Sequence, residues 1–279
     1  MINRRNLIQS LALGAVASRL APAQQYHIRG ANFKLGVASY SFRKFPRAQA
    51  IQMTKELGTP YLNIKDVHLP LTSTPEEIDA AKKEFDDAGI ILVGCGNVSF
   101  EKDDEADIRH KFEYAKRAGF PLIVCAPTHV TLPKLEKFVR EYDIKIAVHN
   151  HGPEDKHFPT PQSVLAVVKN MDPRCGLCID IGHTSRTGVD LVESIAEAGP
   201  RLLDMHAKDL SDPKVKESQV PVGDGKLPIP QIFLQLIKMK YGGCVNLEYE
   251  VHPDNPLPGM QKSFSYMRGV LAGIEATSA

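Results

Sequence analysis

The 279-residue chain carries 34 lysines and arginines against 33 aspartates and glutamates, so its formal net charge is only +1. Proteins that bind the nucleic-acid backbone need a basic face, so this balance argues against a nucleic-acid partner. The length beyond residue 25 is typical of a single α/β barrel.

The amino-terminal segment has the pattern of an export signal. Arg4 and Arg5 precede the apolar stretch LIQSLALGAVAS, which is shorter than a membrane-spanning helix, and a small-x-small triplet follows. The arginine pair followed by Asn-Leu-Ile resembles a twin-arginine signal, with an ordinary secretory signal as the alternative. We therefore expect residues 1–25 to be a cleaved signal peptide and residues 26–279 to form the catalytic domain. The mature protein is expected in the periplasm, without membrane association.

Eight short apolar runs alternate with helical patterns along the rest of the chain. The connections between these runs are long enough for a crossover helix, which favours parallel strands over hairpins. The pattern predicts a single (β/α)8 TIM barrel. An open doubly wound sheet is the alternative, but no GxGxxG follows the first run. The expected strands cover residues 34–40, 60–66, 90–96, 121–127, 145–151, 176–182, 201–207 and 244–250.

The segments between the strands carry helix start and stop signals. In the segment 73–89, Ser73 or Thr74 is the expected N-cap, Pro75 stands at the first helical position and Gly89 ends the helix. An apolar stripe behind a capping residue or a proline also predicts helices in segments 160–171 and 228–240.

The chain has five cysteines, an odd number that cannot all pair. Four of them, Cys95, Cys125, Cys178 and Cys244, lie in or beside apolar runs and are expected to be buried free thiols. Cys175 and Cys178 form a CxxC that has no second pair to complete a zinc knuckle.

Polar side chains gather where the last four expected strands end. In a TIM barrel the chemistry lies at the carboxyl ends of the strands, where the loops converge. Imidazoles and carboxylates on one rim are the ligands for a divalent metal such as Mn, Mg, Co or Zn. The candidates are His149 and His151, Asp180 and His183, His206, Lys208 and Asp209, and Glu248 and Glu250.

The alternation of side chains along a strand helps to choose among them. Glu248 and Glu250 share one face of their strand, and Glu248 lies deeper in the barrel, which makes it the better ligand. The same reasoning favours His149 as the ligand and places His151 near the substrate, although this choice stays open at the sequence level.

The order and spacing of these motifs resemble the xylose isomerase-like TIM barrels, also called sugar phosphate isomerases/epimerases. The resemblance covers nearly all of the chain after the signal. It implies one divalent metal held by His149, Asp180, His206 and Glu248, and a substrate contact at His183. The motifs are LGVASYSF at the first strand, the NHG turn at 149–152, DIGH at 180–183, HAKD at 206–209, GDG at 223–225 and LEYE at 247–250.

One position departs from the family. The family commonly has glutamate where this chain has His149, and in the ketose 3-epimerases that glutamate is both a ligand and one of two catalytic acid/bases. Imidazole binds the same metals and moves protons, but it does not supply the same negative charge. The departure favours one-base chemistry, such as dehydration or β-elimination next to a ketone.

The expected function is that of a metal-dependent lyase or isomerase acting on a keto-sugar or 3-keto-glycoside. It proceeds by proton abstraction next to a carbonyl and a metal-stabilised enediolate. The base is Glu248, or otherwise His151 or Glu250, and His183 or Lys208 orients the substrate. Further substrate contacts are expected at Lys65, His68, Asn97 and Lys208.

Three alternatives stay open at this point. The first is isomerisation or epimerisation of a free ketose, and the second is a non-catalytic sugar-binding barrel, for which the His149 departure speaks. The third is endonuclease IV-like phosphodiester cleavage, which needs an Asp-x-His after the seventh strand where this chain reads Asp224-Gly225-Lys226. The oligomeric state is not predicted.

Overall fold

The computed structural model of the chain describes residues 31–278. The expected export signal, residues 1–25, lies outside the described residues. The cleavage and the periplasmic location that it implies therefore stay predictions. Across the described part, none of the helices combines the length and apolar character needed to cross a bilayer.

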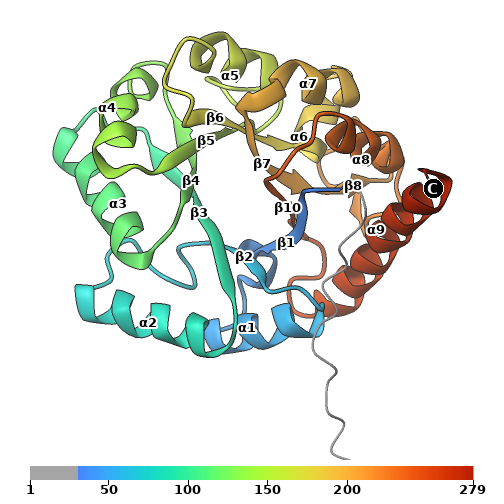
Figure 1. Cartoon of the computed structure of the whole chain (residues 1–279), viewed down its shortest axis with the longest axis horizontal. Helices are drawn as coiled ribbons and strands as arrows, with labels where there is room; N and C mark the ends of the chain where they lie inside the picture. Colours follow the sequence, from blue (N-terminus) through green and yellow to red (C-terminus); the bar gives the residue numbers. More distant parts are fainter. Residues whose placement is uncertain (1–30, 279) are drawn as a thin grey trace, which may run out of the picture.

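Eight parallel strands close into a barrel, with helices around its outside (Figure 1). Going round the barrel the order is β1-β10-β7-β6-β5-β4-β3-β2. Each barrel strand therefore pairs with the barrel strands that come before and after it in the chain, and the last strand, β10, pairs with the first. The predicted (β/α)8 barrel is confirmed, and all eight expected strands are present. They are β1 (Lys34–Ala38), β2 (Tyr61–Ile64), β3 (Ile91–Phe100), β4 (Leu122–Pro127), β5 (Lys145–His149), β6 (Cys175–Asp180), β7 (Leu202–Ala207) and β10 (Cys244–Leu247).

Helices cover the outer face of the barrel and start where the sequence signals predict. Thr74 caps α2 by accepting from the Glu77 amide, while Glu77 reaches back in a full capping box. Thr160 caps α5 in the same way with Ser163. The helices are α1 (Arg47–Glu56), α2 (Pro75–Asp87), α3 (Glu105–Ala118), α4 (Leu132–Tyr142), α5 (Pro161–Val168), α6 (Ile181–Arg186), α7 (Leu191–Ala198), α8 (Ile229–Lys238) and α9 (Leu257–Ser278), with 3-10 turns η1 (Ser39–Phe42) and η2 (Gly199–Arg201).

The apolar core has two parts because parallel strands bury both of their faces. The larger part lies between the strands and the helices. A smaller cluster lies on the opposite face of strands β4, β5 and β6, toward the barrel interior. Its members are Leu122, Val124, Ala147 and Cys178. All five cysteines are free and buried, which confirms the expectation for Cys95, Cys125, Cys178 and Cys244.

A short antiparallel hairpin that the sequence did not predict follows β7. Its strands are β8 (Asp209–Leu210) and β9 (Gln219–Val220). The buried Asp209 carboxylate accepts from the backbone amides of Gly223, Gly225 and Leu227, and so shapes the GDG loop. A Cβ on Gly225 would lie 2.1 Å from Asp209 Oδ1, which explains the glycine there.

Candidate metal centre

Four side chains from four successive strands of the barrel meet at one rim. His149 ends β5, Asp180 ends β6, His206 lies in β7 and Glu248 follows β10. One ligand atom from each lies within 4.8 Å of all the others. His149 Nε2 is 3.0 Å from His206 Nδ1, which is 3.2 Å from Glu248 Oε2. The structure thus brings together the four residues that the sequence predicted as metal ligands.

The ammonium of Lys208 lies among the same carboxylates. Lys208 Nζ is 3.1 Å from Asp180 Oδ2 and 2.9 Å from Glu248 Oε2, and it also donates to Glu250. Burial alone would lower the pKa of Lys208, but Asp180, Glu248 and Glu250 raise it well above its usual value. Lys208 is therefore a fixed positive charge inside the site.

Burial and neighbouring charges keep three of the four candidate ligands in metal-binding forms. The exception is His206: burial would lower its pKa, but Glu248 and Asp204 raise it above its usual value, so a cation must displace a proton there. Burial first, and then His151, hold the pKa of His149 well below its usual value, so this imidazole is neutral. Burial would raise the pKa of Asp180, but His183 and Lys208 hold it well below its usual range. Lys208 and His206 do the same for Glu248. Neutral imidazole and ionised carboxylate are the forms that coordinate cations.

The donor set fits a divalent cation. Buried polar atoms in proteins almost always have a hydrogen-bond partner. Among the described residues, however, Asp180 Oδ2 accepts no hydrogen bond, and its one close charged partner is the Lys208 ammonium at 3.1 Å; His149 Nδ1 and His206 Nε2 are also buried without a hydrogen bond. His149 Nε2 and His206 Nδ1 lie 3.0 Å apart in a hydrogen bond, a separation at which both nitrogens could also bind one cation beside them. Two imidazoles with two carboxylates suit Mn, Co or Zn.

The two histidines of the NHG turn have different positions. β5 ends at His149, and His151 lies beyond the strand with its ring centroid 4.3 Å from that of His149. Asn97 Nδ2 lies 2.9 Å from His151 Nε2, and Asp155 Oδ2 lies 3.4 Å from His151 Nδ1. The geometry puts His149 in the four-residue cluster and His151 beside it.

His183 lies in the first turn of α6, directly above Asp180. Asp180 caps this helix by accepting from the His183 backbone amide. The His183 ring has Nε2 3.9 Å from Asp180 Oδ2 and Nδ1 2.8 Å from Arg186. Burial lowers the pKa of His183, which favours the neutral ring.

The remaining predicted substrate contacts do not share one environment. Lys65 Nζ donates to the Asn97 carbonyl at 2.9 Å, and both residues line a cavity of about 350 Å³. His68 is buried, with Ser39 Oγ 2.9 Å from Nδ1 and the Phe45 carbonyl 3.1 Å from Nε2. Because both of its ring nitrogens already have protein partners, the geometry gives no support to a substrate contact at His68.

A polar layer that the sequence analysis missed lies one step deeper in the barrel. Asp204 precedes His206 by two residues on β7, and Asn246 has the same relation to Glu248. Asn246 Nδ2 donates to Asp204 Oδ1 at 2.8 Å, and the Cys178 thiol donates to Asp204 Oδ2 at 3.7 Å. Polar residues inside otherwise apolar strand runs were the available signal.

Gln219 is a second residue that the sequence analysis missed. Its side-chain amide donates to the Glu248 carbonyl at 2.7 Å and accepts from the Glu250 amide at 3.0 Å. The hairpin thereby holds the segment that carries both glutamates. No sequence pattern marked this role.

Solved structures share the fold of this chain at low sequence identity. An IolI protein with a bound zinc atom aligns with a TM-score of 0.72 and 18% identity over 86% of this chain and 99% of that one. D-psicose 3-epimerase from Clostridium cellulolyticum H10 gives 0.68 and 16% over 86% and 99%. The probable 3-DHS dehydratase AsbF from Bacillus anthracis gives 0.69 and 12% over 85% and 99%. No curated protein matches the sequence.

A family model supplies the assignment that these low identities do not. It is described as a xylose isomerase-like TIM barrel and matches residues 51–270, which is most of the chain. The matched region contains all four residues of the cluster and seven of the eight strands of the barrel. The chain therefore belongs to the xylose isomerase-like TIM barrel family.

Proposed function

We propose that the protein is a metal-dependent lyase or isomerase that acts on a keto-sugar or 3-keto-glycoside by removing a proton next to a carbonyl. The observation that carries the proposal is the convergence of His149, Asp180, His206 and Glu248 on one point at the catalytic rim of the barrel. The zinc-bound IolI protein, which has the same fold, is consistent with a metal in this family.

A cation held by these four residues would supply Lewis-acid polarisation of the substrate carbonyl. Lys208, which three carboxylates hold in its charged form, can stabilise a developing negative oxygen through its charge. His183 and the pair of Lys65 and Asn97 lie at the rim and can orient hydroxyl groups. These roles need no change in the fold, because every group is already held by its neighbours.

The base is best assigned to a residue next to the cluster rather than inside it. Glu248 is held ionised with a low pKa by Lys208 and His206, which makes it a weak base. Unlike the buried His68, His151 is partly exposed. Asp155 lies against its Nδ1, and its Nε2 becomes available as a base when the contact with the Asn97 amide opens. Its imidazole is the first candidate, and Glu250, which is paired with Lys208, is the second.

Two features favour elimination over epimerisation. Epimerisation at one carbon uses an acid/base on each face of the substrate, and the imidazole of His149 replaces one carboxylate that the ketose 3-epimerases use. The fold itself does not decide between the two reactions, because a probable dehydratase and an epimerase both have it. The proposed export of the chain also suits a glycoside substrate better than a phosphorylated metabolite. Epimerisation of a free ketose stays as the second candidate, because D-psicose 3-epimerases share the fold.

The test is turnover by the metal-loaded enzyme in deuterated water, with methyl and aryl 3-keto-glucosides and with free ketoses as separate substrates. The lyase should release the aglycone from the 3-keto-glucosides and leave a double bond at the carbon that lost its proton. An isomerase or epimerase should instead return a proton and so place solvent deuterium at the carbon next to the carbonyl. Exchange and isomerisation of free ketoses alone would select the epimerase. Absence of both exchange and aglycone release in every substrate, with metal bound, would refute both.

The variant His206→Ala separates an enzyme from a sugar-binding barrel. An enzyme of the proposed type should lose metal binding and turnover together in this variant. A binding protein should keep its sugar affinity without metal. Calorimetry with the same sugars gives this affinity directly.

A further inference from the structure

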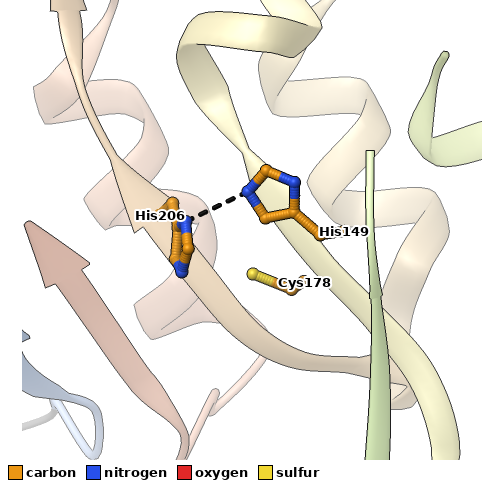
Figure 2. Close-up of side chains that lie close together, drawn as sticks. All are labelled: His149, Cys178 and His206. Atoms are coloured by element: carbon orange, nitrogen blue, oxygen red, sulfur yellow. Dashed lines mark hydrogen bonds between the residues drawn. The ribbon is translucent and has the colours of Figure 1, made fainter. Parts of the chain in front are cut away.

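A thiol lies directly beneath the candidate metal centre. Cys178 precedes Asp180 by two residues on β6, so its side chain is on the same face and one layer deeper. Its Sγ and one nitrogen each of His149 and His206 all lie within 4.8 Å of one another. Figure 2 shows the sulfur directed toward the two imidazoles, which share a hydrogen bond above it.

The surroundings of this thiol differ from those of the strand thiols Cys95 and Cys125. Cys95 and Cys125 belong to the apolar core between strands and helices. Cys178 instead faces two imidazoles, and its hydrogen bond goes to the buried Asp204 carboxylate. His206 Nε2, also buried, finds no hydrogen-bond partner in the described part of the chain. A thiol with two imidazoles beside it and an acid behind it is a set of metal donors.

We propose that Cys178, His149 and His206 form a second ligand set, which holds a thiophilic divalent cation such as Cd²⁺. The two ligand sets share both imidazoles, so cations at the two depths compete for the same residues. Hard cations such as Mn²⁺ prefer the carboxylates of Asp180 and Glu248, whereas sulfur selects softer ions. The centre thus has two depths, and the softness of the ion decides which depth it occupies.

Cation binding at this depth displaces one proton. The cation replaces the proton of the Cys178 thiol, because the thiolate is the form that binds metals. Asp204 Oδ2, 3.7 Å from the sulfur, is in place to receive that proton. An ion at the lower depth no longer has Asp180 and Glu248 as its ligands, so soft cations should inhibit the metal-loaded enzyme.

The experiment is a Cd²⁺ titration of the metal-free full chain, followed by the ultraviolet thiolate-to-cadmium charge-transfer band. We expect one equivalent to produce the band in the wild type and in the control Cys125→Ala. Cys178→Ala should lose the band and bind Cd²⁺ at least about tenfold more weakly, while Mn²⁺ affinity stays within about twofold. A band that persists in Cys178→Ala would overturn the proposal.

A second measurement needs no substitution and so avoids any folding defect of the variant. The ¹¹³Cd NMR shift of the wild-type complex distinguishes a sulfur ligand from nitrogen and oxygen ligands alone. A shift typical of nitrogen and oxygen ligands would refute the second set but leave the four-residue centre intact. Absence of Mn²⁺ binding would instead count against that centre and against the proposed function.

Discussion

At the scale of single residues, the most informative group is Lys208. Its ammonium lies within ion-pair distance of three carboxylates, two of which are candidate metal ligands. A buried charge is tolerated only when it is paired. Removing one member of the pair leaves the other as an uncompensated buried charge, which strongly destabilises the folded state. Lys208 and a divalent cation therefore neutralise the same two carboxylates, Asp180 and Glu248, and should oppose each other in binding.

The variant Lys208→Met tests this opposition. Without metal, Asp180 and Glu248 lose their cation, and we expect the free energy of unfolding to fall by about 3–5 kcal/mol. Mn²⁺ should bind at least about tenfold more tightly than in the wild type and restore most of that loss, because it meets two uncompensated charges. Urea denaturation with and without chelator, together with chelator competition, measures both quantities.

The control for this variant is Lys262→Met. Lys262 pairs with Asp224 at 2.6 Å on the surface, with more than half of its side chain exposed. Its loss should change the free energy of unfolding by at most about 1 kcal/mol and leave Mn²⁺ affinity unaltered. Weaker Mn²⁺ binding in Lys208→Met would show that the lysine supports the metal instead of competing with it.

The raised pKa of Asp204 predicts that the free energy of unfolding depends on pH. Burial raises its pKa from 3.8 to about 6. An acid whose pKa is raised in the folded state holds its proton more tightly there than in the unfolded state. Its contribution to stability is therefore complete below about pH 4 and is lost as the pH rises through 6. Above that window the free energy of unfolding should be lower by about 3 kcal/mol than at low pH, because the buried carboxylate is then ionised and one pKa unit corresponds to about 1.4 kcal/mol.

Asp204→Asn should therefore remove this pH dependence. The amide oxygen can still accept from Asn246, so the variant keeps the hydrogen bond that Asn246 now makes to Asp204 Oδ1. Measured in chelator, the free energy of unfolding of the variant relative to the wild type should rise by about 2–3 kcal/mol between pH 4 and pH 7. Parallel pH curves for the two proteins would mean that Asp204 does not titrate in this window.

At the scale of elements, the strands were predictable and their ends were not. Continuous apolar runs indicated all eight barrel strands, because parallel strands are buried on both faces. The expected last strand ran to Glu250, but β10 ends at Leu247, where the chain turns to meet Gln219. The partner hairpin has only two residues in each strand, too few to leave a periodic pattern.

Gln219→Ala tests whether this hairpin positions the glutamates. Loss of the side-chain amide leaves the Glu248 carbonyl and the Glu250 amide without their partners. The melting temperature should change little, because one partly exposed hydrogen-bonding pair is worth about 1 kcal/mol. The turnover rate should fall about tenfold, because a small misplacement of catalytic groups is expensive. Ser211→Ala, on the same hairpin, is the control, and an equal loss of rate there would assign the effect to the hairpin as a whole.

At the scale of the whole molecule, closure of the barrel is what made the candidate site predictable. Strands adjacent in the sequence are adjacent in the barrel, and the pairing puts Asp180 opposite His206 and His206 opposite Asn246. The four ligand candidates could therefore be chosen from strand ends alone. The layer of Cys178 and Asp204 could not, because the register shifts between Leu177 and Cys178 and sets which side chains meet in depth.

The final prediction concerns the thermal stability of the whole barrel. A ligand that binds only the folded state stabilises it by RT ln(1 + [L]/Kd), which is about 2.7 kcal/mol at one hundred times Kd. For a domain of this size that corresponds to a rise of about 5–10 °C in the melting temperature. Mn²⁺ at that excess should produce this shift in the wild type, and His206→Ala should abolish it because one of the four ligands is missing. His110→Ala removes an exposed histidine that bonds only the Leu71 carbonyl and should keep the full shift. An undiminished shift in His206→Ala would place the stabilising cation elsewhere on the protein.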